Sequence, residues 1–519
     1  MPLFPLCLVA LSAGMVIPAV YALIDHDWRS ARGFLYCAIF TGFAAAALSV
    51  VMATHRRTGA ARGELLEFLV CWLLVPAFAA APLWLRTPFV GPGGAWFEMI
   101  SAFTTTGGTI YEEPGKVPGA LHLWRGMVAW FGGLFTLIAA FAILAPRNLG
   151  GFEVTASGAA GAGAPVLFAE GSVARLSVRL ARALRTVLPV YSVMTAVLAF
   201  LFSALGQDGL SAAVHAMAIV STSGISPHGH GLAEVSSIPA EAVAALFMVA
   251  AATRLTYARG RWLREPLRWL RDPELRLMAV LVATATLALF LRHWFGVLTI
   301  DLGDRVSSAL PALWGAIFTG ISFLTTTGFE SASWHTARDW SGLDNPGLIL
   351  LGLCAIGGGA ATTAGGIKLI RAYALLRHGY RELERISQPN SAMGTGARLR
   401  GILREGAFLA WAFIMLYSAA VFLSMIALTV SGLAFEHALV GALSSISNTG
   451  PAFALVTPDQ IDFTRLSESQ RAILGLTMIV GRIEVLAVIS LFNPDSWSGL
   501  RLGAKNAGNA LHKASQSKW

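Results

Sequence analysis

The chain has 519 residues, of which 55% are hydrophobic and only 13% are charged. A soluble protein of this length needs far more polar surface, so the composition excludes an ordinary soluble protein and indicates a membrane protein. The net charge of +9 would suit a nucleic-acid partner. However, the arginines and lysines crowd alternate loops, as in the cytoplasmic loops of membrane proteins. We therefore expect a multi-pass protein in a lipid bilayer, with both termini in the cytoplasm and no nucleic acid as a partner.

Ten apolar runs have the length of about 20 residues that crosses a bilayer. They cover residues 2–24, 33–54, 64–85, 121–145, 182–205, 238–256, 275–299, 345–368, 405–431 and 470–493. The end of the first run mimics the cleavage site of a secretory signal. Such a signal begins with a basic region, and the first 28 residues contain no Lys or Arg. We expect an uncleaved first helix.

Four shorter apolar segments lie at residues 94–104, 211–221, 309–324 and 435–446. They are too short to cross a bilayer and are predicted to be re-entrant helices. Each ends in Thr, Ser or Asn residues followed by glycine, in what we number loop 1 (104–108), loop 2 (221–225), loop 3 (325–329) and loop 4 (447–451). Irregular backbone at membrane depth is tolerated only against protein or water, so the loops are expected to face a pore or cavity.

The order of long run, short segment, loop and second run occurs four times. It predicts an all-α polytopic membrane protein with four pseudo-repeated helix–pore-loop–helix units around a central ion pore, plus two N-terminal transmembrane helices. The expected boundaries are 1–63 for those two helices, 64–150 for unit 1, 151–260 for unit 2, 261–400 for unit 3, and 401–519 for unit 4 with a cytoplasmic tail. A Gly- and Ala-rich stretch at 150–166 is expected to be a mobile cytoplasmic connection.

The loops suit a dehydrated cation, which requires several oxygens at fixed distances without a full negative charge that would trap it. Backbone carbonyls of four loops can supply these oxygens, because glycine reaches the necessary dihedrals at no steric cost. Neighbouring Thr and Ser hydroxyls are further acceptors. Contact of small residues between helices is the alternative interpretation of one such loop. Four of them, each after a half-length segment on the same side, indicate a cation pathway.

The loops and three further stretches resemble the Trk/Ktr/HKT superfamily of potassium transporters, and most closely its bacterial TrkH/TrkG branch. The further stretches are Leu123, Trp124 and Arg125 with Trp130, Phe131, Gly132 and Gly133; the glycine-rich residues 357–368; and Gly481, Arg482, Ile483 and Glu484. In that family the four loop glycines form the selectivity filter, and glycine in all four loops accompanies potassium preference.

The resemblance implies a filter made of Thr105, Thr106, Gly107, Thr222, Ser223, Gly224, Thr326, Thr327, Gly328, Asn448, Thr449 and Gly450. It implies potassium as the substrate ion, bound at Thr106, Gly107, Ser223, Gly224, Thr327, Gly328, Thr449 and Gly450.

The glycine-rich stretch in unit 3 is not expected to form a stiff helix, because Gly costs roughly 1 kcal/mol at each interior helix position. By resemblance it is an intramembrane gate comprising Gly357, Gly358, Gly359, Thr362, Thr363, Gly365, Gly366 and Lys368. Ala361 and Ala364 stand where the family more often has glycine, so a stiffer loop is expected here. Close packing of small residues is the alternative.

Three further positions carry charge near the expected pore. Arg482 lies near the middle of the last span, where a charge is costly and usually functional; resemblance makes it a pore barrier below the filter. The alternative is an ion pair with Glu484, although residues i and i+2 do not face each other on a helix. Glu330 is expected either to concentrate cations at the outer mouth or to be an ordinary solvated carboxylate. His228 and His230 are surface residues or give a pH response.

These features favour potassium uptake across a bacterial inner membrane, by a protein that is not an enzyme. The resemblance implies a homodimer and a TrkA-like cytosolic ring of nucleotide-binding subunits on the basic inner loops. A sodium-selective or sodium/proton-coupled transporter of the same superfamily is the second hypothesis, and Gly107 argues against it. A membrane-embedded enzyme would require clustered His, Cys or carboxylates within the spans, whereas the 11 histidines are scattered.

Overall fold

The computed structural model describes residues 3–54, 61–145, 176–257, 272–296, 303–343, 345–387, 397–456 and 463–483. Within these ranges the regular structure is helical, and they contain no strand. This confirms the all-α membrane fold. The connection expected at 150–166 and the predicted tail after residue 494 lie outside the described residues.

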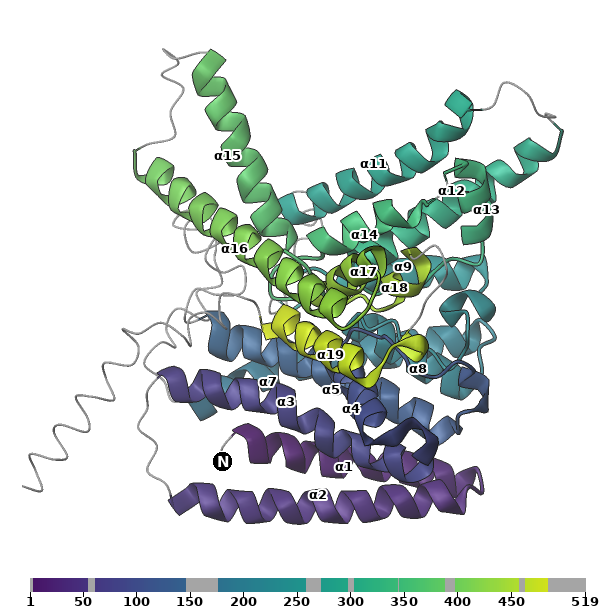
Figure 1. Cartoon of the computed structure of the whole chain (residues 1–519), viewed down its shortest axis with the longest axis vertical. Coiled ribbons are helices and arrows are strands. Elements are labelled where there is room, and N and C mark those ends of the chain that lie inside the picture. The colour runs from purple at the N-terminus through teal and green to yellow at the C-terminus, as the bar shows by residue number, and fades with distance from the viewer. Residues whose placement is uncertain are drawn as a thin grey trace, which may run out of the picture.

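The first two helices form an antiparallel pair at the edge of the molecule (Figure 1). They are α1 (Leu3–Ile24) and α2 (Trp28–Thr54). Asp27 lies in the turn between them, where its carboxylate accepts hydrogen bonds from the backbone N–H and the hydroxyl of Ser30 at 3.1 and 2.6 Å. Arg86, at the end of α3 (Ala61–Arg86), approaches the same carboxylate at 3.5 Å. The pair is thereby joined to the first unit.

The remaining helices follow the expected order of long helix, short helix and second helix. Unit 1 contains α3, α4 (Gly91–Phe103) and α5 (Gly119–Ala139), which continues as a π-helical turn, η3 (Ala140–Leu144); unit 2 contains α7 (Leu176–Ala204), α8 (Gly209–Ser221) and α9 (Ile238–Ala251). Unit 3 contains α11 (Pro273–Gly296), α12 (Gly303–Leu324), α13 (Trp334–Ser341) and α14 (Gly347–Ile356), followed by α15 (Leu369–Ser387). Unit 4 contains α16 (Ala397–Val430), α17 (Phe435–Ile446), α18 (Pro451–Val456) and α19 (Glu468–Ile483).

Seven of the described helices are long and apolar enough to cross a membrane, against the ten spans predicted. The prediction was too long for α9, which has 14 residues and ends at Ala251 because the chain turns there toward unit 3. It was too long for α14, which has 10 residues and ends where Gly357 adopts a φ of 72°. The last predicted span is described only as far as Ile483.

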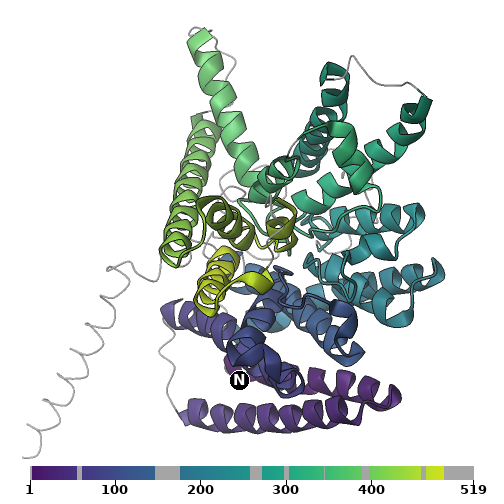
Figure 2. The ribbon, with the colours of Figure 1, turned by 45° about the vertical axis from the view of Figure 1, so that its right-hand side comes forward.

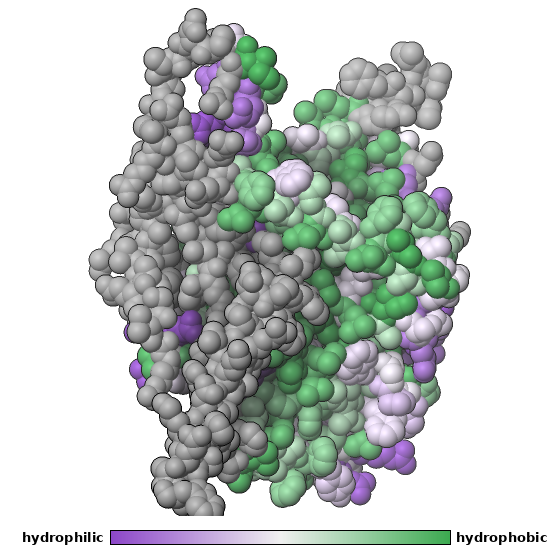
Figure 3. Space-filling view, turned by 60° about the vertical axis from the view of Figure 1, so that its left-hand side comes forward, coloured by the Kyte–Doolittle hydropathy of each residue, from purple (hydrophilic) through white to green (hydrophobic). Residues whose placement is uncertain are grey.

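The outer faces of the long helices are apolar. Large side chains such as Phe43, Phe200, Phe408 and Phe422 are exposed on α2, α7 and α16. Figure 3 shows one such face, where hydrophobic residues cover much of the described surface and hydrophilic residues gather toward its margins. A soluble protein rarely exposes so large an apolar surface, whereas hydrocarbon tails of lipid would cover it without cost.

The four units succeed one another around a common centre, so that colour passes from blue through teal and green to yellow around the molecule in Figure 2. The helices that precede the loops, α4, α8, α12 and α17, are called the pore helices below. Of these, α12 has 22 residues and begins six residues before the half-length segment predicted at 309–324. The second helix of each unit packs against the pore helix of the next: α5 against α8, α9 against α12, α14 against α17, and α19 against α4. The last contact closes the arrangement into a ring.

Two glycines allow the pore helices to approach the second helices of their own units closely. A Cβ atom on Gly132 of α5 would lie 1.8 Å from the carbonyl oxygen of Phe103, at the end of α4. A Cβ atom on Gly481 of α19 would lie 2.1 Å from the carbonyl oxygen of Ile446, at the end of α17. Phe103 and Ile446 hold corresponding places, four residues before a loop glycine, so units 1 and 4 share one packing device.

We predict that Gly132→Ala destabilises the protein. The added methyl group must push α4 away from α5, and overpacking of this kind costs about 1–3 kcal/mol. Gly352→Ala on α14 is the matched control, since nothing lies within 4 Å of its Cβ position and replacing a helical glycine gains up to about 1 kcal/mol. Thermal unfolding in detergent should show a lower midpoint for Gly132→Ala alone. Equal midpoints would refute the packing argument.

Candidate functional site

The four loops leave their pore helices in the same way. In each, the backbone N–H of the residue before the loop glycine donates to the carbonyl oxygen five residues earlier. The pairs are Thr106 to Ser101 and Ser223 to Ala218 at 2.8 Å, and Thr327 to Ser322 and Thr449 to Ser444 at 2.9 Å. The sequence predicted four equivalent loops at the ends of short helices, and the backbone hydrogen bonds of the structure have this repetition.

The second residue before each loop glycine has a positive φ. The values are 54° at Thr105, 55° at Thr222, 59° at Thr326 and 55° at Asn448. A β-branched residue in this region is a true outlier, and such strain of about 1–3 kcal/mol persists only where the surroundings impose it, often at functional sites. The sequence analysis assigned the unusual dihedrals to the loop glycines and named no other residue for them. The residue type indicates a positive φ weakly at Asn448, because Asn tolerates this conformation. At the three threonines the residue type gives no such indication.

The loops contact one another in a closed circle. A Cβ atom on Gly107 of loop 1 would lie 1.8 Å from the carbonyl oxygen of Ser223 in loop 2, and one on Gly224 would lie 2.1 Å from that of Thr327 in loop 3. One on Gly328 of loop 3 would meet the ring of Pro451 in loop 4 at 2.9 Å. Gly450 of loop 4 closes the circle, because its N–H donates to the carbonyl oxygen of Thr106 at 2.6 Å. The four predicted glycines therefore meet about one centre.

Only glycine fits at positions 107 and 224, for two reasons. Any Cβ at Gly107 or Gly224 would overlap a backbone oxygen of the next loop, and both glycines also have positive φ, at 78° and 65°. Gly328 has a φ of 84°, and its Cβ would lie 2.9 Å from the ring of Pro451. Gly450 departs from the pattern, since it lies outside the positive-φ region and leads directly into α18.

Hydroxyl groups line the first three loops. Thr104 and Thr106 hydroxyls lie 2.8 Å apart, and the pairs Ser221 with Ser223 and Thr325 with Thr327 each lie 3.1 Å apart. All of these side chains are buried.

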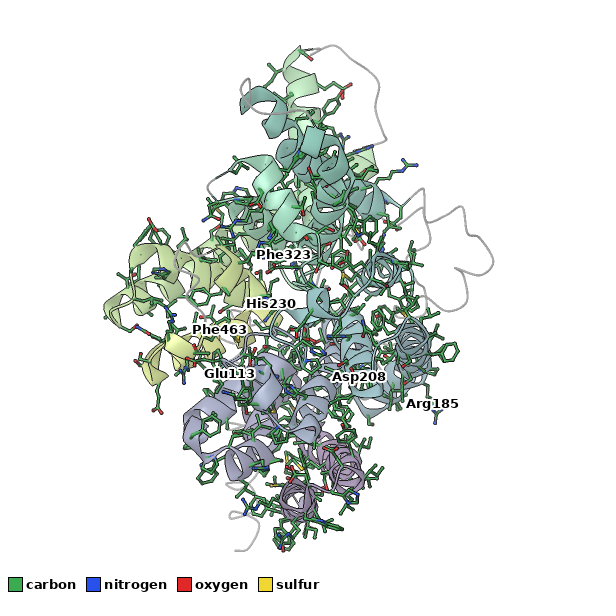
Figure 4. All side chains as sticks on the ribbon, turned by 90° about the vertical axis from the view of Figure 1, so that its right-hand side faces the viewer. Glu113, Arg185, Asp208, His230, Phe323 and Phe463 are labelled. Carbon is green, nitrogen blue, oxygen red and sulfur yellow. The ribbon has the colours of Figure 1, made fainter. Side chains whose placement is uncertain are left out.

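Figure 4 looks roughly along the helices and shows Glu113, Asp208, Phe323 and Phe463, one from each unit, arranged around the middle of the view near His230.

The glycine-rich stretch predicted to be a gate lies against three of the loops. The N–H of Gly365 donates to the hydroxyl of Thr326 in loop 3 at 2.8 Å. A Cβ on Gly365 would also lie 2.0 Å from the carbonyl oxygen of Ser447 in loop 4. The Thr363 hydroxyl donates to the carbonyl oxygen of Val220, beside loop 2, at 3.4 Å. The structure therefore brings this stretch directly to the ends of the pore helices.

The same stretch folds back on itself instead of continuing α14. The N–H groups of Ile367, Lys368 and Leu369 donate to the carbonyl oxygens of Ala355, Ile356 and Gly358 at 3.0, 2.9 and 2.9 Å. Ala361 has a φ of 54°, which glycine would adopt without strain. Ala361, which was expected to stiffen this loop, is thus held in a backbone conformation that is unfavourable for alanine.

Two cationic side chains border a small cavity between this stretch, the end of α5 and α19. Arg482 of α19 is buried, and its guanidinium donates to the hydroxyl of Thr105. The ammonium group of Lys368 donates to the carbonyl oxygen of Ala364. Both line a cavity of about 30 Å³, together with Thr136, Thr362 and Gly365, which is space for one or two water molecules. Glu484, the alternative partner of Arg482, lies outside the described residues.

A charged cluster behind the stretch was missed by the sequence analysis. Gly359 donates its N–H to the carbonyl oxygen of Ala252, just after α9, at 3.0 Å. A Cβ on Gly359 would also lie 2.9 Å from the buried carboxylate of Glu274, which Arg254 approaches at 3.8 Å. Arg254 also lies 3.7 Å from Asp272. The sequence did show a carboxylate, Glu274, at the start of an apolar run. Nothing in the sequence indicated that this carboxylate lies beside Gly359.

The outer side of the ring carries the remaining predicted residues. Glu330 is half-buried, and burial raises its pKa while the nearby His335, His230 and Arg338 oppose the rise. His228 is tied into the loop 2 region, with its Nε2 2.7 Å from the Ser211 hydroxyl. His230 is exposed.

Comparison with known proteins identifies the family. The sequence profile of the TrkH family, described as cation transport protein, matches residues 31–498. The Trk system potassium uptake protein TrkH of Escherichia coli K12 is 28% identical over 503 residues, which cover 95% of this chain and 97% of that protein. TrkH of Halomonas elongata is 26% identical, with the same two coverages.

A solved structure has the same fold. The crystal structure of the potassium transporter TrkH from Vibrio parahaemolyticus superposes with a TM-score of 0.76 at 23% sequence identity, covering 96% of this chain and 98% of that one. The profile match spans most of the chain, and the helices and four converging loops suit a polytopic transporter. The chain belongs to the TrkH family of cation transport proteins.

Proposed function

We propose that this protein takes up potassium ions, which pass through the ring of four loops as a selectivity filter. The observation that carries the proposal is the closed circle of contacts among Gly107, Gly224, Gly328 and Gly450. A ring of backbone carbonyls replaces the water around a potassium ion without trapping it. The names of the relatives, which are potassium uptake proteins, support potassium as the substrate.

We propose that the ion then meets the glycine-rich stretch as a gate. Its contacts with loops 2, 3 and 4 support a role in closing the path below the filter. Arg482 and Lys368 beside the small cavity add positive charge to the same region. A cation that leaves the filter would meet this electrostatic barrier, which would keep few ions in the path.

We further propose a bacterial inner-membrane location with both termini in the cytoplasm, supported by the basic alternate loops. The chain would act as a homodimer, with a TrkA-like ring of nucleotide-binding subunits on its cytoplasmic side. The relatives' names place them in a Trk system, which supports a partner of this kind.

The direct test is rescue of a bacterium that lacks potassium uptake. The wild-type chain should restore growth at low potassium, and Gly107→Ala should not, because its Cβ would overlap the carbonyl oxygen of Ser223. Gly115→Ala is the control, since nothing lies within 4 Å of that position, and it should rescue fully. Absence of rescue by wild-type protein that is present in the membrane would contradict the proposal.

Neutralising the barrier should speed transport. For Arg482→Gln we expect rubidium uptake to rise about fivefold, because removing an interaction on the order of 1 kcal/mol changes a rate by about that factor. Arg471→Gln is the matched control on the same helix; its guanidinium bonds the carbonyl oxygens of Phe463 and Thr464 instead. If Arg482→Gln only lowers the amount of folded protein, the arginine has a structural role and the proposed barrier is wrong.

The outer carboxylate should make uptake depend on pH. Glu330 attracts cations only while ionised, and its raised pKa means that it loses its charge at a higher pH than an exposed glutamate. Apparent potassium affinity should therefore fall as the pH is lowered, and Glu330→Gln should lack this part of the fall. At neutral pH the variant should bind roughly two- to fivefold more weakly, since a charge 4 Å away in water is worth about 1 kcal/mol. Identical pH profiles of Glu330→Gln, the exposed control Glu112→Gln and wild type would make Glu330 an ordinary surface group.

A further inference from the structure

One pore-helix position connects each pore helix to the segment beyond its loop. It lies nine residues before the loop glycine and is occupied by Glu98, His215, Thr319 and Gly441 in units 1 to 4. We call it the tether position. In every unit it contacts a residue two or three places after the loop glycine, although the chemistry of the contact differs.

In unit 1 the contact is ionic and fully buried. Glu98 accepts hydrogen bonds from the N–H of Ile110 at 2.9 Å and from the hydroxyl of Thr109 at 3.1 Å. Arg125 of α5 donates to the same carboxylate at 2.6 Å, and both charged side chains are about 2% exposed. Charge-assisted hydrogen bonds are among the strongest in proteins, so this tether is firm.

In unit 2 a buried histidine takes the place of the glutamate. His215 lies between Gln207, whose side-chain oxygen is 3.0 Å from Nδ1, and Ser226, whose hydroxyl is 2.9 Å from Nε2. With Nδ1–H donating to Gln207, Nε2 accepts the hydroxyl proton of Ser226. That hydroxyl also accepts the N–H of His228 at 3.0 Å. The chain leaving loop 2 is thus connected to α8 through side chains alone.

In unit 3 the tether is weak and a second residue reinforces it. The Thr319 hydroxyl accepts the N–H of Ser331 at a long 3.3 Å. Glu241 of α9, in the neighbouring unit, accepts from the hydroxyl of Ser331 and from the N–H of Ala332, both at 2.7 Å. It also accepts from the indole N–H of Trp314 on α12 at 2.7 Å. This buried carboxylate therefore joins the pore helix and the outgoing segment of unit 3 to unit 2.

In unit 4 the polar contact is replaced by packing. Gly441 has no side chain, and the ring of Phe453 occupies the space, 3.2 Å from where a Cβ would lie. Phe453 in turn packs on Phe463, with ring centroids 4.9 Å apart. The contact again joins the tether position to the third residue after the loop glycine.

We propose that the tether position, with Glu241 as its reinforcement, sets the width of the ring and so determines how well potassium is distinguished from sodium. Each loop glycine lies between two fixed points, the end of its pore helix and the tethered segment. Releasing one point lets the loop move toward or away from the centre, and a ring that adapts to a smaller ion loses selectivity. These are positioning residues, and the inference rests on the proposed filter function.

Thr319→Val tests this with the least disturbance, since it removes the hydroxyl and keeps the shape. Ser226→Ala tests the unit 2 tether from its other end, and Thr319→Ser, which keeps the hydroxyl, should restore wild-type behaviour. Thr41→Val is the matched control: Thr41 is equally buried, on α2, and its hydroxyl has no hydrogen-bond partner in the described part of the chain. The readouts are sodium competition against rubidium uptake, and the shift of the melting temperature of purified protein by potassium and by sodium.

Thr319→Val and Ser226→Ala should each reduce discrimination against sodium about three- to tenfold, the effect of one lost hydrogen bond, without lowering protein yield. Thr41→Val and Thr319→Ser should match wild type. Gly328→Ser, which alters the ring itself, is the reference and should also admit sodium. If only Gly328→Ser changes selectivity, the tether proposal fails and the filter stands. If Gly328→Ser, Thr319→Val and Ser226→Ala all keep wild-type selectivity, both proposals fail.

Discussion

Backbone from neighbouring units meets in the ring at distances that leave no room for a side chain. The contacts of Gly107 with Ser223 and of Gly224 with Thr327 require the pore helices to converge, and the pore helices converge because the second helices admit them closely. Gly132 and Gly481 provide that approach in units 1 and 4. The positive φ values before each loop glycine are the local consequence, since the chain must turn sharply where the carbonyl oxygens face their neighbours.

Charge is placed around this neutral ring rather than within it. Arg482 and Lys368 line the small cavity beside the glycine-rich stretch, and Glu330 follows loop 3 in the chain. Two of the buried carboxylates have cationic partners: Glu98 has Arg125, and Glu274 has Arg254. An unpaired charge at this depth would cost several kcal/mol. In the proposed pathway, neutral oxygens in the middle and charges at the two ends would bind a cation weakly enough to release it.

The sequence predicted the large features because bilayer thickness fixes helix length. Half-length segments followed by glycine therefore identified α4, α8 and α17 to within three residues, and four such loops predicted their convergence. Contacts between distant parts of the chain could not be predicted in this way. The hydrogen bond from the N–H of Gly359 to the carbonyl oxygen of Ala252, just after α9, is an example, because it depends on the position of unit 3.

The tether residues illustrate the same limit, although some of them left a signal. Glu98 and Glu241 are carboxylates inside apolar segments, and such residues are usually functional. Their partners could not be read from the sequence, because Ile110 and Ala332 contribute only backbone N–H groups. The departure of Gly450 from positive φ accompanies a difference in composition, since only loop 4 has a proline after its glycine, and Pro451 begins α18.

The circle of loops closes between the first unit and the last, where Asn448 and Gly450 donate hydrogen bonds to Thr106, which precedes Asn448 by 342 residues. During synthesis, Thr106 enters the membrane long before its partners exist. Until α17 and loop 4 arrive, the polar backbone of the earlier loops faces either water or lipid, which leaves unsatisfied groups at a cost of several kcal/mol each. A chain truncated before unit 4 would therefore be a target for membrane quality control rather than a partly active transporter.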